Sequence, residues 1–157
     1  MMLRFRKMMA VLLAAALTLT MLTACGGGGS GASVDAKVKL TESVNEALKK
    51  DGYTEILKYD AELDKTAYLY RENSDVRGIN KDWKEKNVNR RLFKVDVLEA
   101  KKANSASKIA EEIKPTLENI KGDDWSIGYY VEPKENNKKE VVSREITIIL
   151  EWKEVTK

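Results

Sequence analysis

This 157-residue chain has no histidine and a single cysteine, which limits the acid, base and metal chemistry that it can perform near neutral pH. It contains no His, which removes the usual general base and the usual zinc ligand. Its one cysteine, Cys25, has no partner for an intrachain disulfide. Its five methionines all lie before Cys25, so the rest of the chain has no soft metal ligand. Catalysis would therefore depend on carboxylates, lysines, tyrosines or hydroxyl groups.

Two adjacent acids, Asp123 and Asp124, are the most prominent candidates for acid and base catalysis. They precede an alternating apolar segment that begins at Trp125. Because neighbouring residues of an extended chain point to opposite faces, these two carboxylates cannot together flank one glycosidic bond. We interpret them as part of a turn that follows Gly122.

A second group of acids, Asp60, Glu62 and Asp64, alternates along the chain in a way that could suit calcium. The calcium loop of an EF-hand would need a glutamate at the position that Arg71 occupies, so the pattern fails. We interpret these acids as a solvated turn. The sequence therefore predicts no metal site, no cofactor and no enzymatic activity.

The start of the chain has the features of a secretory signal peptide over residues 1–24. A basic stretch with Arg4, Arg6 and Lys7 precedes an apolar run over residues 8–22. This run is shorter than the roughly 20 residues that a membrane-spanning helix needs. We therefore expect a cleaved signal rather than a permanent transmembrane anchor.

The cleavage region Leu22, Thr23, Ala24 and Cys25 resembles the lipobox of bacterial lipoproteins. The resemblance implies that Cys25 receives a diacylglyceryl thioether and that the chain is cut before it. Cys25 would then be the first residue of the mature protein, and acyl chains such as palmitate would hold it in the cell membrane. The expected location is the extracellular face, with the membrane as a partner through the lipid on Cys25.

Residues 25–33 form a Gly/Ser-rich tether between the lipidated cysteine and the rest of the chain. A flexible tether of this length reaches roughly 15 to 18 Å. Residues 34–157 then form one globular domain by length and composition. The whole layout is similar to small lipoproteins of Gram-positive bacteria, especially Firmicutes. That resemblance implies location and architecture, and it supplies no catalytic residues.

The charge of the mature part argues against nucleic-acid binding. Residues 1–24 carry three of the 28 basic residues and no acidic residue. The remaining 25 basic and 25 acidic residues give a net charge of zero. The basic character of the precursor therefore belongs to its targeting segment, and we expect no nucleic-acid partner and a monomer.

Basic charge is nevertheless concentrated in residues 77–94, which hold seven basic and two acidic residues. Basic side chains alternating with Trp83 and Phe93 could bind an anionic cell-wall polymer, acidic headgroups or an envelope protein. A solubilising loop at a sheet edge would have the same composition. The candidate partner-binding residues are Lys81, Trp83, Lys84, Lys86, Arg90 and Arg91.

Three hypotheses on function follow from these observations. The first is a membrane-anchored extracellular lipoprotein that acts as a non-enzymatic binding or interaction module at the cell envelope. The second is a cell-wall glycan hydrolase that uses paired carboxylates, at least one of them in apolar surroundings. The third is an accessory subunit of a membrane transport or secretion complex.

The hydrophobic pattern predicts an α+β fold, with an antiparallel sheet of four to five strands and two helices on one face. We expect one helix from a cap at Thr41 to Gly52, and a second from Ser105 or Ser107 to Gly122, kinked or divided at Pro115. The expected strands are residues 53–59, 66–71, 92–99, 125–131 and 146–152, with a turn at 60–65, a long loop at 72–91 containing at most one helical turn near 81–86, and a hairpin connector at 133–140. Trp125 and Trp152 are in register with aliphatic stripes, which favours core packing.

Overall fold

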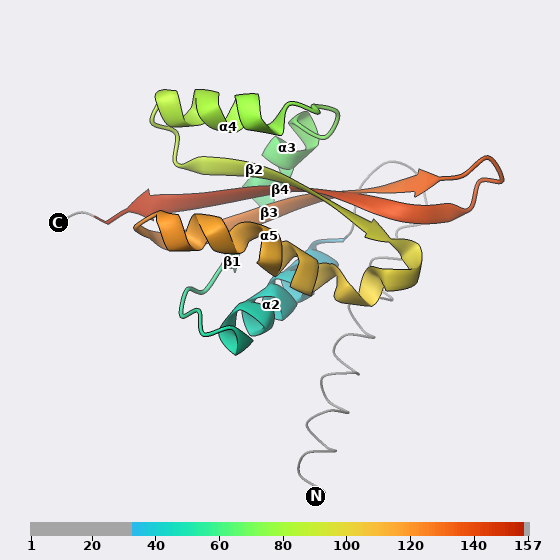
Figure 1. The fold of residues 1–157 in the computed structure, drawn as a ribbon, viewed down its shortest axis with the longest axis horizontal. Helices are drawn as coiled ribbons and strands as arrows, with labels where there is room; N and C mark the ends of the chain where they lie inside the picture. Colours follow the sequence, from blue (N-terminus) through green and yellow to red (C-terminus); the bar gives the residue numbers. More distant parts are fainter. Residues whose placement is uncertain (1–32, 156–157) are drawn as a thin grey trace, which may run out of the picture.

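The computed structural model describes residues 33–155. The predicted signal peptide, the predicted lipobox with Cys25 and all of the predicted tether except Ser33 lie outside the described residues. Along the chain the elements are α2 (Val34–Lys50), β1 (Lys58–Tyr59), α3 (Ala61–Leu69), α4 (Val76–Glu85), β2 (Arg90–Leu98), the 3-10 helix η1 (Glu99–Asn104), α5 (Ser105–Asn119), β3 (Gly122–Glu135) and β4 (Val141–Glu154) (Figure 1).

One sheet of four strands, in the order β1-β3-β4-β2, forms the centre of the domain. The long strands β3 and β4 form a hairpin, and β2 pairs antiparallel with β4. The short strand β1 pairs parallel with β3. The predicted α+β class is confirmed, and the sheet is antiparallel apart from the pair of β1 and β3.

Helices α2 and α5 cover one face of the sheet, as the sequence predicts. The alternation of the strands directs Val95, Tyr129 and Ile148 to this face, and all three are buried. Val44 and Ile113 bring the apolar faces of the two helices onto them, and both are completely buried. This layer forms the main hydrophobic core.

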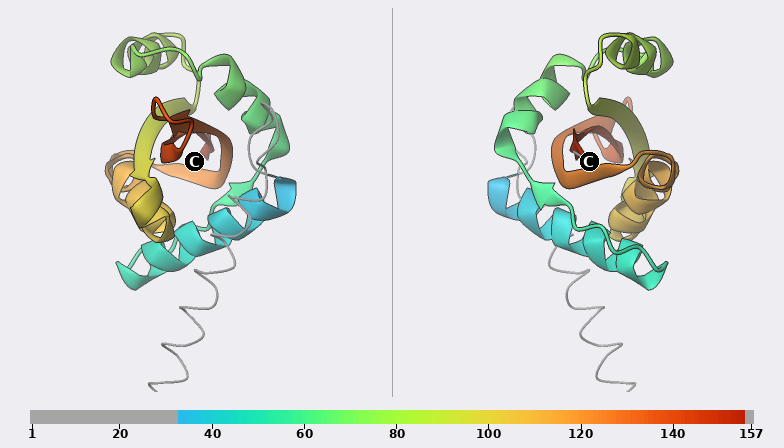
Figure 2. Two further views of the ribbon diagram at one scale, coloured as in Figure 1. Left: turned by 90° about the vertical axis from the view of Figure 1, so that its right-hand side faces the viewer. Right: turned by 90° about the vertical axis from the view of Figure 1, so that its left-hand side faces the viewer.

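Helices α3 and α4 cover the opposite face, where the sequence predicts no more than one helical turn, near residues 81–86. Leu92 and Ile149 point to this side and pack with Leu63, Ala67 and Trp83 in a smaller core. Figure 2 shows the helices placed around the curved sheet when it is viewed end-on. The sheet is therefore covered on both faces, and the prediction of helices on one face only is incomplete.

The strand predicted at 66–71 is wrong, because residues 66–69 belong to α3 and residues 70–71 lie in the turn that follows it. Asp60 caps this helix, and its side chain accepts a hydrogen bond from the Glu62 backbone N–H at 2.9 Å. Leu63, Ala67 and Tyr70 recur at helical spacing and face the smaller core. Tyr68 and Tyr70 lie two residues apart, a spacing that favours a strand when residues 66–71 are considered alone. The longer apolar pattern of this segment has the period of a helix.

The long loop predicted at 72–91 is also wrong, since its middle forms the whole of α4. The side chain of Asp75 caps the helix by accepting from the Gly78 backbone N–H at 2.9 Å. Val76, Ile79 and Trp83 form the apolar stripe that packs on the smaller core. Only three apolar residues carry this stripe, so the many charges around them conceal its period.

The other predicted elements differ mainly in their bounds. The first helix begins at Val34 with Ser33 as its cap rather than at Thr41, and Gly52 follows its end with a positive φ of 87°. The strand expected at 53–59 contracts to Lys58–Tyr59. The sequence predicts a kink or a division at Pro115, and the division is absent because α5 continues past Pro115 to Asn119.

Two asparagine side chains form hydrogen bonds with backbone N–H and carbonyl groups at the two edges of the sheet. The amide of Asn80 in α4 donates to the Leu92 carbonyl at 2.9 Å and accepts from the Leu92 N–H at 2.7 Å. The amide of Asn45 in α2 makes the same pair of hydrogen bonds with Leu57, just before β1, both at 2.9 Å. Each side chain takes the place of a neighbouring strand, and the unpaired groups of an edge would otherwise invite pairing with another chain.

We predict that Asn80→Ala lowers the free energy of unfolding by about 1–3 kcal/mol, because it leaves the backbone polar groups of the buried Leu92 without partners. Urea unfolding followed by circular dichroism measures this change. Asn137→Ala, in the exposed hairpin turn, is the control and should be nearly neutral. Equal stability of the two variants would show that Asn80 does not close the edge.

Candidate functional site

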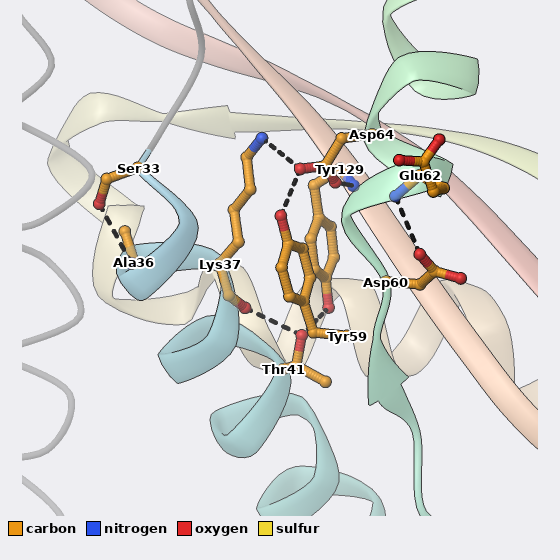
Figure 3. Close-up of polar contacts among 9 residues, drawn as sticks. All are labelled: Ser33, Ala36, Lys37, Thr41, Tyr59, Asp60, Glu62, Asp64 and Tyr129. Atoms are coloured by element: carbon orange, nitrogen blue, oxygen red, sulfur yellow. Dashed lines mark hydrogen bonds and ion pairs between the residues drawn. The ribbon is translucent and has the colours of Figure 1, made fainter.

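The densest group of chemistry-bearing side chains lies between the first turns of α2, the start of α3 and strands β1 and β3. We call it the Asp64 cluster, and Figure 3 shows its geometry. Its members are Lys37, Thr41, Tyr59, Asp64 and Tyr129. The sequence predicts a functional role for none of the five, because they lie far apart along the chain. Only Asp64 attracts attention in the sequence, as one of three alternating acids that we interpret as a solvated turn.

The carboxylate of Asp64 accepts hydrogen bonds from three other elements. The Lys37 ammonium lies 2.7 Å from Oδ2, and the Tyr59 hydroxyl donates to the same oxygen. The Tyr129 backbone N–H donates to Oδ1 at 2.7 Å. The side chains of Lys37 and Asp64 are only 9% and 15% exposed, so the prediction of a solvated turn is wrong for Asp64.

The two tyrosines of the cluster are held by stacking and by hydrogen bonds. Their rings are nearly parallel, with centroids 6.5 Å apart. The Tyr129 hydroxyl lies 3.0 Å from the hydroxyl of Thr41, which donates to the Lys37 carbonyl. Burial and the hydrogen bond to Asp64 raise the pKa of Tyr59, and burial raises the pKa of Tyr129. Both phenols therefore stay protonated at neutral pH.

This arrangement favours a structural role for the Asp64 cluster. Each of its polar side chains already has a partner within the cluster. The two phenols stay protonated near neutral pH, so neither can accept a proton as a general base. A buried carboxylate with three donors stabilises the packing of the elements that supply them. The cluster thus fixes the first turns of α2, next to the point where the chain enters the domain at Ser33.

The predicted partner-binding residues at 81–91 do not form one surface. Trp83 is only 8% exposed and packs edge-on against Tyr70, with ring centroids 5.2 Å apart. Trp83 is therefore a core residue, and it does not contribute to an exposed partner-binding surface. Its apolar partners lie in separate parts of the chain, namely α3 and the sheet, so its burial was not visible in the local sequence.

The arginines at the start of β2 are divided between the two faces of the sheet by the strand alternation. Arg90 pairs with Glu151 of β4 at 2.5 Å. Arg91 points the other way and donates to the hydroxyl of Thr116 in α5 at 3.1 Å. Both side chains are half-buried and hold neighbouring elements together, so they do not extend a common basic surface.

The lysines of α4 remain exposed. Lys81 and Lys84 share one stripe with Arg77, since these positions are four and three residues apart along the helix. Lys86 follows the end of the helix and lies outside that stripe. Its ammonium pairs with the Asp82 carboxylate at 2.9 Å. We refer to Arg77, Lys81 and Lys84 as the basic stripe. Arg77 was not among the predicted partner-binding residues.

The basic stripe is weakly compensated. Lys81 has a distant partner in Glu85, at 3.8 Å, and both side chains are largely exposed. Within residues 33–155, Arg77 and Lys84 make no ion pair or side-chain hydrogen bond. Helix α4 is the outermost element on its face of the sheet (Figures 1 and 2), so the stripe is free to meet a partner.

The chain matches no family model, no curated protein and no solved structure. Within the described part of the chain, no helix has the length and apolar character needed to cross a membrane. The same residues contain no group of three acidic side chains placed to share a metal ion. The function must therefore be argued from the surfaces of this domain alone.

We predict strong coupling between Lys37 and Asp64 in a double-mutant cycle. Asp64→Ala should cost about 3–5 kcal/mol of unfolding free energy, because it leaves a buried ammonium and two other donors unpaired. Lys37→Met should cost about 1–3 kcal/mol, and the double variant should be at least about 1 kcal/mol less destabilised than the sum of the two.

The exposed pair of Lys65 and Glu62 in α3 provides the control for that cycle. Its side chains are 72% and 75% exposed, so the corresponding coupling should stay below about 0.5 kcal/mol. Denaturant unfolding of the native protein and the six variants measures both couplings. Similar values for the two pairs would contradict the structural role of the Asp64 cluster.

Proposed function

We propose that the protein is a membrane-anchored extracellular lipoprotein and that its globular domain is a non-enzymatic binding module at the cell envelope. The observation that carries the proposal is a contrast between two groups of charged residues. The charges of the Asp64 cluster are paired internally, whereas the basic stripe of α4 faces outward with little compensation. Charges that pair within the domain stabilise its fold, whereas exposed charges with little compensation can attract a partner of opposite charge.

The chemistry of the basic stripe suits an anionic polymer of the cell wall. Seven residues separate Arg77 from Lys84, which corresponds to about 10 Å along a helix. Three cations along this line can meet successive phosphates of an extended polymer. Within the stripe, Lys side chains act as point charges and Arg can make bidentate contacts with phosphate. The basic stripe is thus the part of the predicted segment 77–94 that we retain as a binding surface.

The lipid anchor supplies the location in this proposal. It depends on the resemblance of Leu22 to Cys25 to a lipobox, and the tether then places the domain close to the membrane. The described domain begins at Ser33, at the cap of α2. Helix α4 lies on the opposite face of the sheet from α2 (Figure 1), which directs the basic stripe away from the helix that continues the tether.

The two other hypotheses have less support. A glycan hydrolase would need a carboxylic acid with a raised pKa, whereas hydrogen bonds from Lys153 and Lys58 lower the pKa of Asp124 to about 2. An accessory subunit that docks a partner on a sheet edge would have to displace the side chain of Asn80 from Leu92. Both therefore stand as alternatives to the binding module.

Cys25→Ser tests the anchor. The variant lacks the sulfur that would carry the lipid, so we expect it to move from the membrane fraction to the medium. Immunoblots of fractionated cells that express the full chain measure this shift. An unchanged distribution between the fractions would refute the lipobox interpretation.

A paired charge reversal tests the binding surface. Arg77→Glu with Lys84→Glu should weaken binding to a phosphodiester polymer purified from Gram-positive cell walls by at least about tenfold, because each basic residue near a polyanion contributes about 1 kcal/mol. Lys121→Glu with Lys138→Glu makes the same change in net charge at exposed sites outside α4 and should have little effect. Sedimentation with the polymer measures both, and equal losses for the two pairs would remove the basic stripe as the site.

A further inference from the structure

A hollow of about 810 Å³ lies at the end of the sheet where β3 begins and β4 ends. Its lining residues come from the segment before β1, from β1 itself and from the adjoining ends of β3 and β4. The residues that matter here are Glu55, Lys58, Asp123, Asp124, Trp125, Lys153 and Glu154. None of them belongs to the basic stripe or to the Asp64 cluster.

A β-bulge shapes this end of the sheet. The pairing of β3 with β4 shifts between Asp123 and Ser126, so that Asp124 and Trp125 together lie opposite Trp152. Asp124 has a φ of 49°, in the left-handed region that residues other than glycine rarely adopt. The bulge aims the Asp124 carboxylate between the two neighbouring strands.

Two lysines from those neighbouring strands converge on Asp124. Lys58 of β1 lies 2.6 Å from one carboxylate oxygen, and Lys153 of β4 pairs with the other. These hydrogen bonds lower the pKa of Asp124 to about 2, so it is an anion throughout the physiological range. The two lysine side chains are 68% and 76% exposed, and each ammonium keeps further donors for a ligand in the hollow.

The hollow also presents hydrogen-bond acceptors. The side chains of Glu55 and Glu154 make no ion pair or hydrogen bond within residues 33–155. Trp125 is 3% exposed, and its indole Nε1 has no hydrogen-bond partner among the described residues. A buried donor without an acceptor is uncommon in folded proteins and calls for an explanation. This N–H is covered by protein atoms, so it is not a contact point for a ligand in the hollow.

We propose that this hollow binds a neutral sugar unit of a cell-wall glycan. A sugar ring offers hydroxyl groups that both donate and accept, which matches the mixture of ammonium and carboxylate groups around the hollow. Its apolar faces suit the exposed side chains of Ile56 and Val155 at the same site. A strongly anionic ligand would meet the carboxylates, and a strongly cationic one would meet the lysines.

The hollow would give the domain a second, independent contact with the envelope. The basic stripe recognises charge, whereas the hollow recognises hydroxyl geometry. The two sites lie on different elements, so each can be removed without the other. Binding of sugar can therefore fail while binding of the polyanion persists, and the reverse also holds.

Titration of the domain with a soluble tetramer of N-acetylglucosamine tests this proposal. Intrinsic tryptophan fluorescence is the readout, because Trp125 lines the hollow and its ring lies 5.4 Å from that of Trp152. We expect saturable binding with a change in emission. No saturable signal at millimolar sugar, in fluorescence and in calorimetry alike, would overturn the proposal.

Two pairs of substitutions identify the class of ligand. Glu55→Ala with Glu154→Ala removes acceptors, and Lys58→Ala with Lys153→Ala removes donors. For a neutral sugar, both pairs should weaken binding by at least about tenfold. Tighter binding after either pair is removed would indicate recognition of charge instead and would contradict the proposal.

Matched controls separate this site from the rest of the domain. Glu42→Ala with Glu46→Ala changes the charge equally on the exposed face of α2 and should leave sugar affinity unchanged. Arg77→Glu with Lys84→Glu should also leave it unchanged, because the basic stripe is a separate surface. Loss of sugar binding in either control would place the site elsewhere.

Discussion

The carboxylate of Asp64 is the interaction on which the arrangement of the N-terminal half depends. Its own helix, α3, has only a small buried face, and β1 has only two residues. Neither element could hold its place through hydrophobic burial alone. The contacts from Lys37, Tyr59 and the Tyr129 backbone join α2, β1 and β3 to the start of α3. One side chain thus connects elements on both faces of the sheet.

The closure of the sheet determines which surfaces remain for recognition. Both faces carry helices, and asparagine side chains occupy backbone groups at both edges. An extended partner would therefore find few free backbone groups along those parts of the edges. The outward face of α4 and the hollow at the Asp124 bulge are two of the surfaces that remain exposed. The two proposals concern these surfaces.

The parts of the fold that the sequence predicts are those whose pattern is long and local. The strands near residues 92–99, 125–131 and 146–152 have clear alternation, and the helix after Ser105 repeats apolar residues every four positions. The segments that form α3 and α4 were misinterpreted because their buried faces are narrow and their contacts lie on distant strands. Burial of Trp83 and pairing of Asp64 depend on the same distant contacts. The roles of Trp83 and Asp64 are therefore set by contacts between distant segments, which the local sequence pattern does not reveal.

Hydrogen exchange at the Tyr129 backbone amide tests the central role of Asp64 most directly. This N–H donates to the Asp64 carboxylate, on an edge of β3 that β1 no longer covers. We predict that Tyr129 exchanges as slowly as the amides of the central strands in the native protein. In Lys37→Met with Asp64→Ala, exchange at Tyr129 and in the first turns of α2 should accelerate by more than about tenfold, while α5 stays protected. Unchanged protection of Tyr129 and α2 in that variant would contradict the account.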